Sequence, residues 1–159
     1  MFQFNQIYII LSLMLGLVLQ MLPMPDWAQH YRPDWVALIL IYWSMALPNR
    51  VGMWFAFIVG IIVDVSQAML LGQHSLALVV IIFINVNLHQ RIRVLPLHQQ
   101  AFYVWILLSI SQALIIWVEG TLGRSPTAIT FFASPLIGMF IWPWVFIVLR
   151  DIRRKGGIK

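Results

Sequence analysis

A single carboxylate, Asp64, lies partway along an apolar run of membrane-spanning length, Val51 to Gly72. A charge in hydrocarbon is costly unless it faces protein or a polar cavity. If a helix begins near Val51, a rise of about 1.5 Å per residue places Asp64 roughly 20 Å along it, in the outer half of a membrane. Two interpretations follow: a substrate or proton site, or a carboxylate hydrogen-bonded to a neighbouring helix. We favour the second, because a proton pathway usually needs several ionisable groups and only Glu119 can be added.

Small residues accompany this carboxylate at every fourth position. The ladder consists of Gly52, Ala56, Gly60, Asp64, Ala68 and Gly72. Small side chains at this spacing allow another helix to approach closely. Because a spacing of four drifts about 40° per step against the helical repeat of 3.6, the ladder suits a right-handed crossing. The pattern predicts a helix-packing or partner interface, either within one subunit or with another membrane protein.

Further polar side chains lie on neighbouring apolar segments. Ser109, Gln112 and Glu119 share one helical face, since their spacings of three and seven match the helical repeat. Together with residues elsewhere, they suggest an intramembrane polar pocket lined by Asp64, Gln67, Asn85, Gln112 and Glu119. The competing interpretation is a set of ordinary interhelical hydrogen bonds worth about 0.6 kcal/mol each, and we favour it.

No residue pattern indicates catalysis or metal binding. The histidines are scattered and form no HExxH motif, so we predict no metal site. No serine lies in a GxSxG elbow, and no glycine-rich loop precedes a lysine. Cysteine is absent, which excludes disulfides and thiolate metal sites. We therefore predict no enzymatic activity and no cofactor.

The elements that must position these residues are membrane helices. Hydrophobic residues make up 62% of the 159 residues and charged residues only 9%, against roughly one quarter charged in an average soluble domain. The net charge of +5 would suggest nucleic acid for a soluble protein, but here the basic residues cluster at helix ends and we expect no nucleic-acid partner. A single integral membrane domain, 1–159, accounts for the whole chain.

Six apolar segments predict an all-α, polytopic bundle. They cover residues 4–22, 33–47, 51–71, 74–88, 100–119 and 126–150, and a basic tail covers 150–159. The second segment is short for a perpendicular crossing, so it needs bilayer thinning or shelter by its neighbours. Pro135 and Pro143 should kink the sixth segment or reset its start. Six crossings place both termini on the same side of the membrane.

The basic residues indicate which side that is. The termini share their side with Arg50, Arg91, Arg93, Arg150, Arg153, Arg154, Lys155 and Lys159, and the other side has only Arg32 and Arg124. The positive-inside rule therefore predicts cytoplasmic termini, N-in and C-in. The same basic residues are expected to contact anionic lipid, at about 1 kcal/mol per charge.

Several short sequence motifs together resemble a known protein family. These motifs are Arg32-Pro33-Asp34-Trp35, Tyr42-Trp43, Ala46-Leu47-Pro48-Asn49-Arg50-Val51, Ala56-Phe57, Gly60, Asp64, Leu71-Gly72 and Trp142-Pro143-Trp144. In this combination the chain resembles the bacterial rod shape-determining protein MreD from about Met21 to Arg154. It departs from the usual pattern after Asp64, where many relatives have a glycine and this chain has Ala68. That difference puts a break in the backbone there in doubt.

The resemblance implies a multi-pass subunit of the cell inner membrane within the elongasome, the peptidoglycan-synthesis machinery that maintains cell shape. Its implied partners are MreC, a bitopic protein bound directly, and, in the larger complex, RodA, penicillin-binding protein 2 and MreB. The implied fold is similar to that of the substrate-binding subunits of energy-coupling-factor transporters. Two functions stay open: a non-catalytic scaffold that binds MreC, and a ligand-binding or transport subunit that uses the polar pocket around Asp64.

Overall fold

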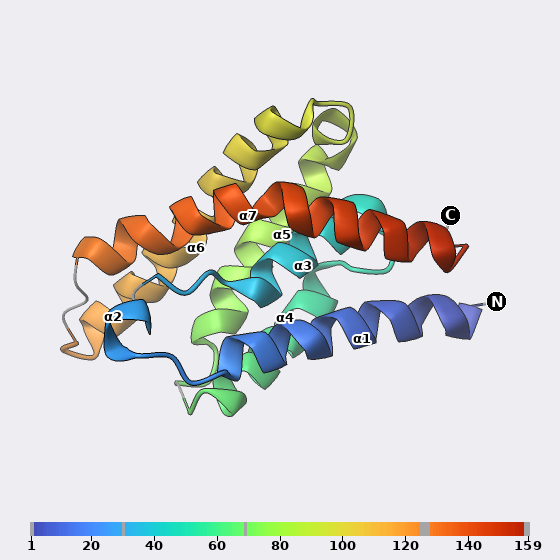
Figure 1. Cartoon of the computed structure of the whole chain (residues 1–159). Helices are drawn as coiled ribbons and strands as arrows, with labels where there is room; N and C mark the ends of the chain where they lie inside the picture. The colour runs from blue at the N-terminus through green and yellow to red at the C-terminus, as the bar shows by residue number, and fades with distance from the viewer. Residues whose placement is uncertain (1, 30, 69, 125–127, 158–159) are drawn as a thin grey trace.

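The computed structural model describes residues 2–29, 31–68, 70–124 and 128–157, which form helices and no strands (Figure 1). The prediction of an all-α chain is confirmed. The helices are α1 (Phe2–Met21), α2 (Asp26–Gln29), α3 (Trp35–Ala46), α4 (Met53–Ser66), α5 (Gln73–Ile92), α6 (Leu97–Thr121) and α7 (Ala128–Lys155). The two termini lie at the same end of the molecule.

Helix α3 lies in the centre of the bundle, where α1, α5, α6 and α7 pack around it. Residues 36–45 of this helix are all buried, so it has no face toward lipid or water. Its 12 residues span about 18 Å, which is short of the roughly 30 Å of a hydrocarbon core. Asp34 caps its first turn by accepting a hydrogen bond from the Ala37 backbone N–H at 3.2 Å. The neighbouring helices therefore shelter the segment that is too short to cross alone.

Buried polar contacts fix α3 against its neighbours. The Asn85 Nδ2 group of α5 donates to the Ile41 carbonyl at 2.9 Å and to the Ser44 Oγ at 2.5 Å. The Tyr103 hydroxyl of α6 donates to the Asn85 Oδ1 at 3.2 Å. Since unpaired polar groups are expensive in an apolar interior, this network specifies how α3, α5 and α6 are placed relative to one another.

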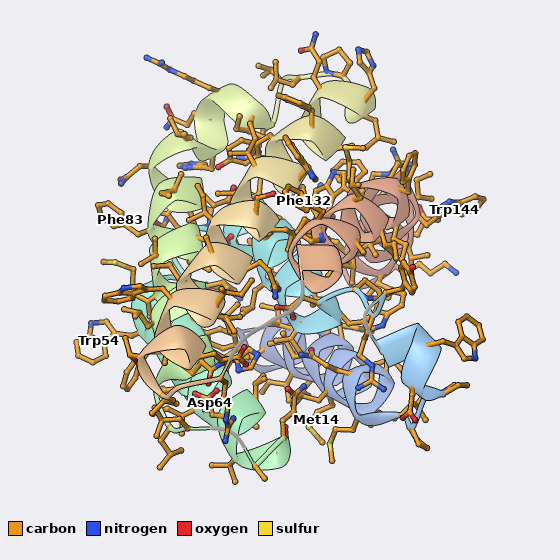
Figure 2. All side chains as sticks on the ribbon, turned by 90° about the vertical axis from the view of Figure 1, so that its left-hand side faces the viewer. Met14, Trp54, Asp64, Phe83, Phe132 and Trp144 are labelled. Carbon is orange, nitrogen blue, oxygen red and sulfur yellow. The ribbon has the colours of Figure 1, made fainter. Side chains whose placement is uncertain are left out.

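The outside of the bundle is apolar (Figure 2). Met14, Trp54, Phe83 and Trp144 project outward from four different helices and are exposed. Three helical stretches of the described chain, Gln73–Ile92, Leu97–Thr121 and Phe132–Lys155, are long and apolar enough to cross a membrane. An apolar surface of this extent is rare on soluble monomers. The architecture is compatible with a membrane helical bundle.

The structure differs from the predicted boundaries at two places. Helix α4 ends at Ser66, although the apolar run predicted a helix to Leu71. Apolar composition does not report backbone conformation, and the chain turns at Ala68, whose φ is 53°, and again at Gly72, whose φ is 99°. The backbone therefore breaks after Asp64, at Ala68, although the resemblance put a break there in doubt because this residue is alanine and not glycine.

The second difference concerns the helices that carry basic residues. Helix α5 continues to Ile92, beyond its predicted end at residue 88, and α7 continues to Lys155, so the first part of the predicted basic tail is helical. Helix α7 runs from Ala128 through both Pro135 and Pro143, and neither proline starts a new helix. The predicted start at residue 126 lies outside the described residues. Helix α2, a single turn of four residues, was not predicted.

Candidate functional site

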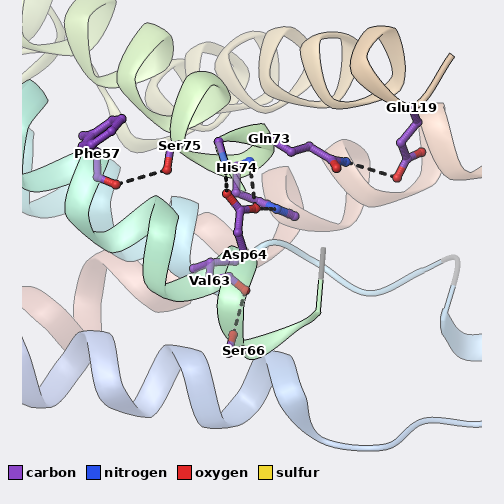
Figure 3. Close-up of polar contacts among 9 residues, drawn as sticks. Phe57, Val63, Asp64, Ser66, Gln73, His74, Ser75 and Glu119 are labelled. Atoms are coloured by element: carbon purple, nitrogen blue, oxygen red, sulfur yellow. Dashed lines mark hydrogen bonds and ion pairs between the residues drawn. The ribbon is translucent and has the colours of Figure 1, made fainter. Parts of the chain in front are cut away.

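Asp64, near the end of α4, is fully buried and accepts three hydrogen bonds from its own chain (Figure 3). One carboxylate oxygen accepts from the Gly72 backbone N–H at 2.9 Å. The other accepts from the His74 backbone N–H at 3.0 Å and lies 2.7 Å from the His74 Nδ1. All three donors belong to the start of α5, so Asp64 joins the end of one helix to the beginning of the next.

The local sequence explains why α5 needs this carboxylate. The first backbone N–H groups of a helix have no partner within the helix. Gly72 occupies the position before α5 in a left-handed conformation, and no side-chain cap comes from this glycine. Asp64 supplies the missing acceptor from α4, and its negative charge also complements the positive end of the α5 dipole. The carboxylate therefore caps α5 from the neighbouring helix.

The small-residue ladder divides at the end of α4. A Cβ atom at Gly60 would lie 2.4 Å from the Ser75 Cα of α5, so the two backbones are as close as helices can pack. The Ser75 hydroxyl adds a hydrogen bond to the Phe57 carbonyl at 3.2 Å. Ala68 and Gly72 lie beyond α4 and belong to the turn instead. A role of the ladder toward another protein stays a prediction.

The residues of the predicted polar pocket have different neighbours. Glu119, on α6, accepts a hydrogen bond from the Gln73 side chain at 3.2 Å, next to the contacts of Asp64. Asn85 belongs instead to the network with α3. It lies 11 residues beyond His74 on α5, which is about 17 Å farther along the helix. The structure therefore brings Asp64 and Glu119 to one end of the bundle and places Asn85 deeper within it.

The two remaining pocket residues form no hydrogen bond with Asp64 in the described part of the chain, where its partners are Gly72 and His74. Gln112 is partly buried on α6. Gln67, just after α4, lines a cavity of about 400 Å³ together with Arg32 and Gln20. No cluster of three or more metal-ligating side chains occurs in the part of the chain that the structure describes.

Sequence reasoning missed His74 as the partner of Asp64. It considered this histidine only as a metal ligand, although a glycine two residues earlier marks a helix start. A carboxylate eight residues before such a glycine, near the end of the preceding helix, is a signal that could have predicted the contact. Since Gln73 and Ser75 also face α4 or α6, three consecutive residues at the start of α5 hold this end of the bundle together.

A second candidate site is an apolar groove between α1 and α7. It encloses about 640 Å³, and its floor is formed by Trp35 and Ile39 of α3. The walls are Tyr8, Leu11, Ser12, Leu15 and Leu19 of α1, and Ile141, Trp144, Val145, Val148, Leu149 and Ile152 of α7. The walls extend over 12 residues of each helix, and the first and last of these lie about 17 Å apart along the axis.

The groove is lined almost wholly by apolar surface, and its hydroxyl-bearing side chains are Tyr8 and Ser12. The Ser12 hydroxyl donates to the Ile9 carbonyl of α1 at 2.8 Å and accepts from the Trp43 indole N–H at 2.9 Å. The second of these bonds ties α1 to the buried α3. An occupant of this groove is therefore apolar along the length that it buries.

A protein family and a known protein match this chain over most of its length. The family model described as rod shape-determining protein MreD matches residues 1–152. The rod shape-determining protein MreD of Haemophilus influenzae is 35% identical over 145 residues, which are 89% of this chain and 87% of that protein. No solved structure matches the chain significantly. The matched region includes α1 to α6 and all but the end of α7.

Proposed function

The chain belongs to the MreD family of rod shape-determining proteins, and from this premise we propose that it is a non-catalytic scaffold of the cell-wall elongation machinery. The resemblance stated from the sequence motifs is confirmed, and the family supports a role in determining rod shape. A scaffold must offer membrane-embedded surfaces to its partners. The groove between α1 and α7 is the feature of this bundle that best fits such a surface.

We assign the groove to the transmembrane helix of MreC. Its lining is almost wholly apolar, and the Ser12 hydroxyl in it is already bonded within the chain, so a polar substrate would find few partners there. Its walls are the two long helices α1 and α7, and the short α3 lies between them (Figure 1). A partner helix would fill the groove by van der Waals packing, which is the main driving force for helix association in lipid. An acyl chain is the competing occupant, and the experiments below distinguish the two.

The scaffold would act within a larger complex. We propose that MreC connects it to RodA, penicillin-binding protein 2 and MreB, in the inner membrane of a bacterial cell. Both termini would be cytoplasmic, because most basic residues lie with them on one side of the predicted topology. A similarity to the substrate-binding subunits of energy-coupling-factor transporters stays a prediction.

The alternative of a ligand-binding or transport subunit has weaker support. Asp64 is fully buried and already accepts three hydrogen bonds from the start of α5, so most of its acceptor capacity is used within the chain. The combined substitutions Asp64→Asn and Glu119→Gln test this alternative. Loss of rod shape while the protein stays folded and bound to MreC would favour a ligand site over the scaffold.

A groove-filling substitution tests the scaffold. Leu15→Trp places an indole in the groove, and Ile58→Trp is the matched control, because Leu15 is 60% and Ile58 57% exposed and only Leu15 lines the groove. In rod-shaped cells depleted of the native protein, we expect the control variant to restore rods and to copurify with MreC. The Leu15 variant should accumulate to the same level but lose both. Equal behaviour of the two variants, or rods that survive depletion, would contradict the proposal.

A further inference from the structure

A basic cavity lies near the end of the bundle that carries the chain termini. It encloses about 190 Å³ and is lined by Tyr42, Met45 and Ala46 of α3, Arg93 and Gln100 around the α5–α6 turn, and Phe146 and Arg153 of α7. A single water takes a share of only about 30 Å³ in the liquid, so the cavity has room for a larger polar group. Neither the scaffold role nor the groove uses this cavity.

Two buried polar atoms in the cavity have no partner in the described chain. Tyr42 is 3% exposed, and its hydroxyl forms no hydrogen bond. Gln100 is also 3% exposed: its Nε2 donates to the Ile92 and Leu95 carbonyls, whereas its Oε1 accepts nothing. A buried polar group without a partner is unfavourable, because it loses its hydrogen bonds to water and gains none in the protein. The cavity therefore presents one free donor and one free acceptor to a ligand.

The charges around the cavity favour an anion. The ionised groups that act on the Tyr42 hydroxyl are three guanidinium groups, of Arg153, Arg150 and Arg93, and one carboxylate, of Asp151. Asp151 lies 4.0 Å from Arg150, and no described carboxylate lies within that distance of Arg93 or Arg153. Guanidinium groups match phosphate oxygens in geometry and charge. Arg93 and Arg153 are thus available to hold a phosphate.

We propose that this cavity binds the head group of phosphatidylglycerol. Arg93, Arg153 and the Tyr42 hydroxyl donate hydrogen bonds to the phosphodiester, and the Gln100 Oε1 accepts one from a glycerol hydroxyl. The head group of phosphatidylglycerol combines an anionic phosphodiester with glycerol hydroxyls. In phosphatidylethanolamine an ammonium group would lie beside the two arginines and be repelled by their like charge. Basic pockets between membrane helices recognise anionic head groups in the same manner. A free phosphate ion could make the same contacts with the arginines. Unlike the lipid, it has no acyl chains to contact the apolar surface around the cavity.

Lipid retention measured by native mass spectrometry tests the assignment. The full-length protein is released from nanodiscs that contain equal amounts of phosphatidylglycerol and phosphatidylethanolamine, and the retained lipids are counted. Two charge-assisted contacts predict at least about tenfold enrichment of phosphatidylglycerol. The combined substitutions Arg93→Gln and Arg153→Gln should abolish this enrichment. Tyr42→Phe should reduce it severalfold without lowering thermal stability, because the hydroxyl that it removes has no partner in the protein.

The matched control removes the same number of charges outside the cavity. Arg91→Gln with Arg154→Gln changes two exposed arginines of α5 and α7 that do not line it. This control should keep the enrichment. An equal loss in the control and in the cavity variant would reduce the effect to general surface charge and overturn the proposal. Displacement of the lipid by millimolar inorganic phosphate would assign the site to a free ion and overturn it as well.

Discussion

Replacing Asp64 by asparagine is expected to destabilise the protein, because this carboxylate caps α5 from α4. Asparagine keeps one acceptor oxygen and replaces the other by a donor. At least one of the backbone N–H groups of Gly72 and His74 then faces an amide nitrogen and loses its partner. A buried donor left unpaired costs about 1–3 kcal/mol. For a chain of 159 residues, that loss corresponds to a fall in Tm of roughly 2–12 °C.

Substituting leucine extends the series. Asp64→Leu removes all three hydrogen bonds and leaves the His74 side chain without its partner. Breaking a buried charged contact in this way costs about 3–5 kcal/mol, so the fall in Tm should be larger than for asparagine. The assay is thermal unfolding of the full-length protein in a mild detergent, followed by intrinsic tryptophan fluorescence. The His74→Ala variant should make the two Asp64 substitutions less damaging, since residues of one network are not additive.

The control is Asp151→Asn, the same chemical change at an exposed carboxylate of α7. Because its ion pair with Arg150 is exposed and long, at 4.0 Å, the substitution should cost at most a few tenths of a kcal/mol, which corresponds to about 1 °C in Tm. If Asp64→Asn proved as harmless as this control, the carboxylate would not be stabilising the start of α5. The capping interpretation would then be refuted.

Three further substitutions test the packing by the same thermal assay. Gly60→Ala should lower stability by about 1–3 kcal/mol, because its Cβ would lie 2.4 Å from the backbone of α5. Ala68→Gly should raise stability by about 1 kcal/mol, because alanine at a φ of 53° is strained and glycine is not. Asn85→Leu should lower it by about 1–3 kcal/mol, because the Ser44 and Tyr103 hydroxyls lose a buried partner.

Each of these substitutions has a control or a contradicting outcome. Gly120→Ala should be neutral or stabilising, since nothing lies within 4 Å of its added Cβ, and an equal loss at Gly60 and Gly120 would refute close packing. Asn87→Leu changes an exposed asparagine on the same helix as Asn85 and should have little effect. A lower Tm after Ala68→Gly would mean that the left-handed turn is not strained.

The helical fold could be predicted from composition because long apolar runs in a membrane protein permit few other structures. The end of α4 could not, because residues 67–71 are as compatible with a helix in composition as those before them. What ends the helix is a tertiary contact: Asp64 holds the start of α5, and the chain must turn back to reach it. Local sequence does not record such a contact.

The candidate site was predictable only in part. A buried carboxylate with a partner on another helix followed from the cost of charge in lipid, and Asp64 fits that expectation. The spacing of small residues predicted a close helix contact, and Gly60 makes one with α5. The groove and the basic cavity were not predictable, because each is lined by residues of three elements that are far apart in the sequence.

Site-specific photocrosslinking in intact cells tests the scaffold and its groove most directly. A photoreactive amino acid replaces Leu15 on α1 or Val148 on α7, which both line the groove and are exposed. The same amino acid at Ile58 on α4 or Phe83 on α5 probes other exposed faces. The account predicts crosslinks to MreC from the two groove positions and none from the other two. Crosslinks to MreC from α4 or α5 alone, or crosslinks to lipid alone from the groove, would contradict it.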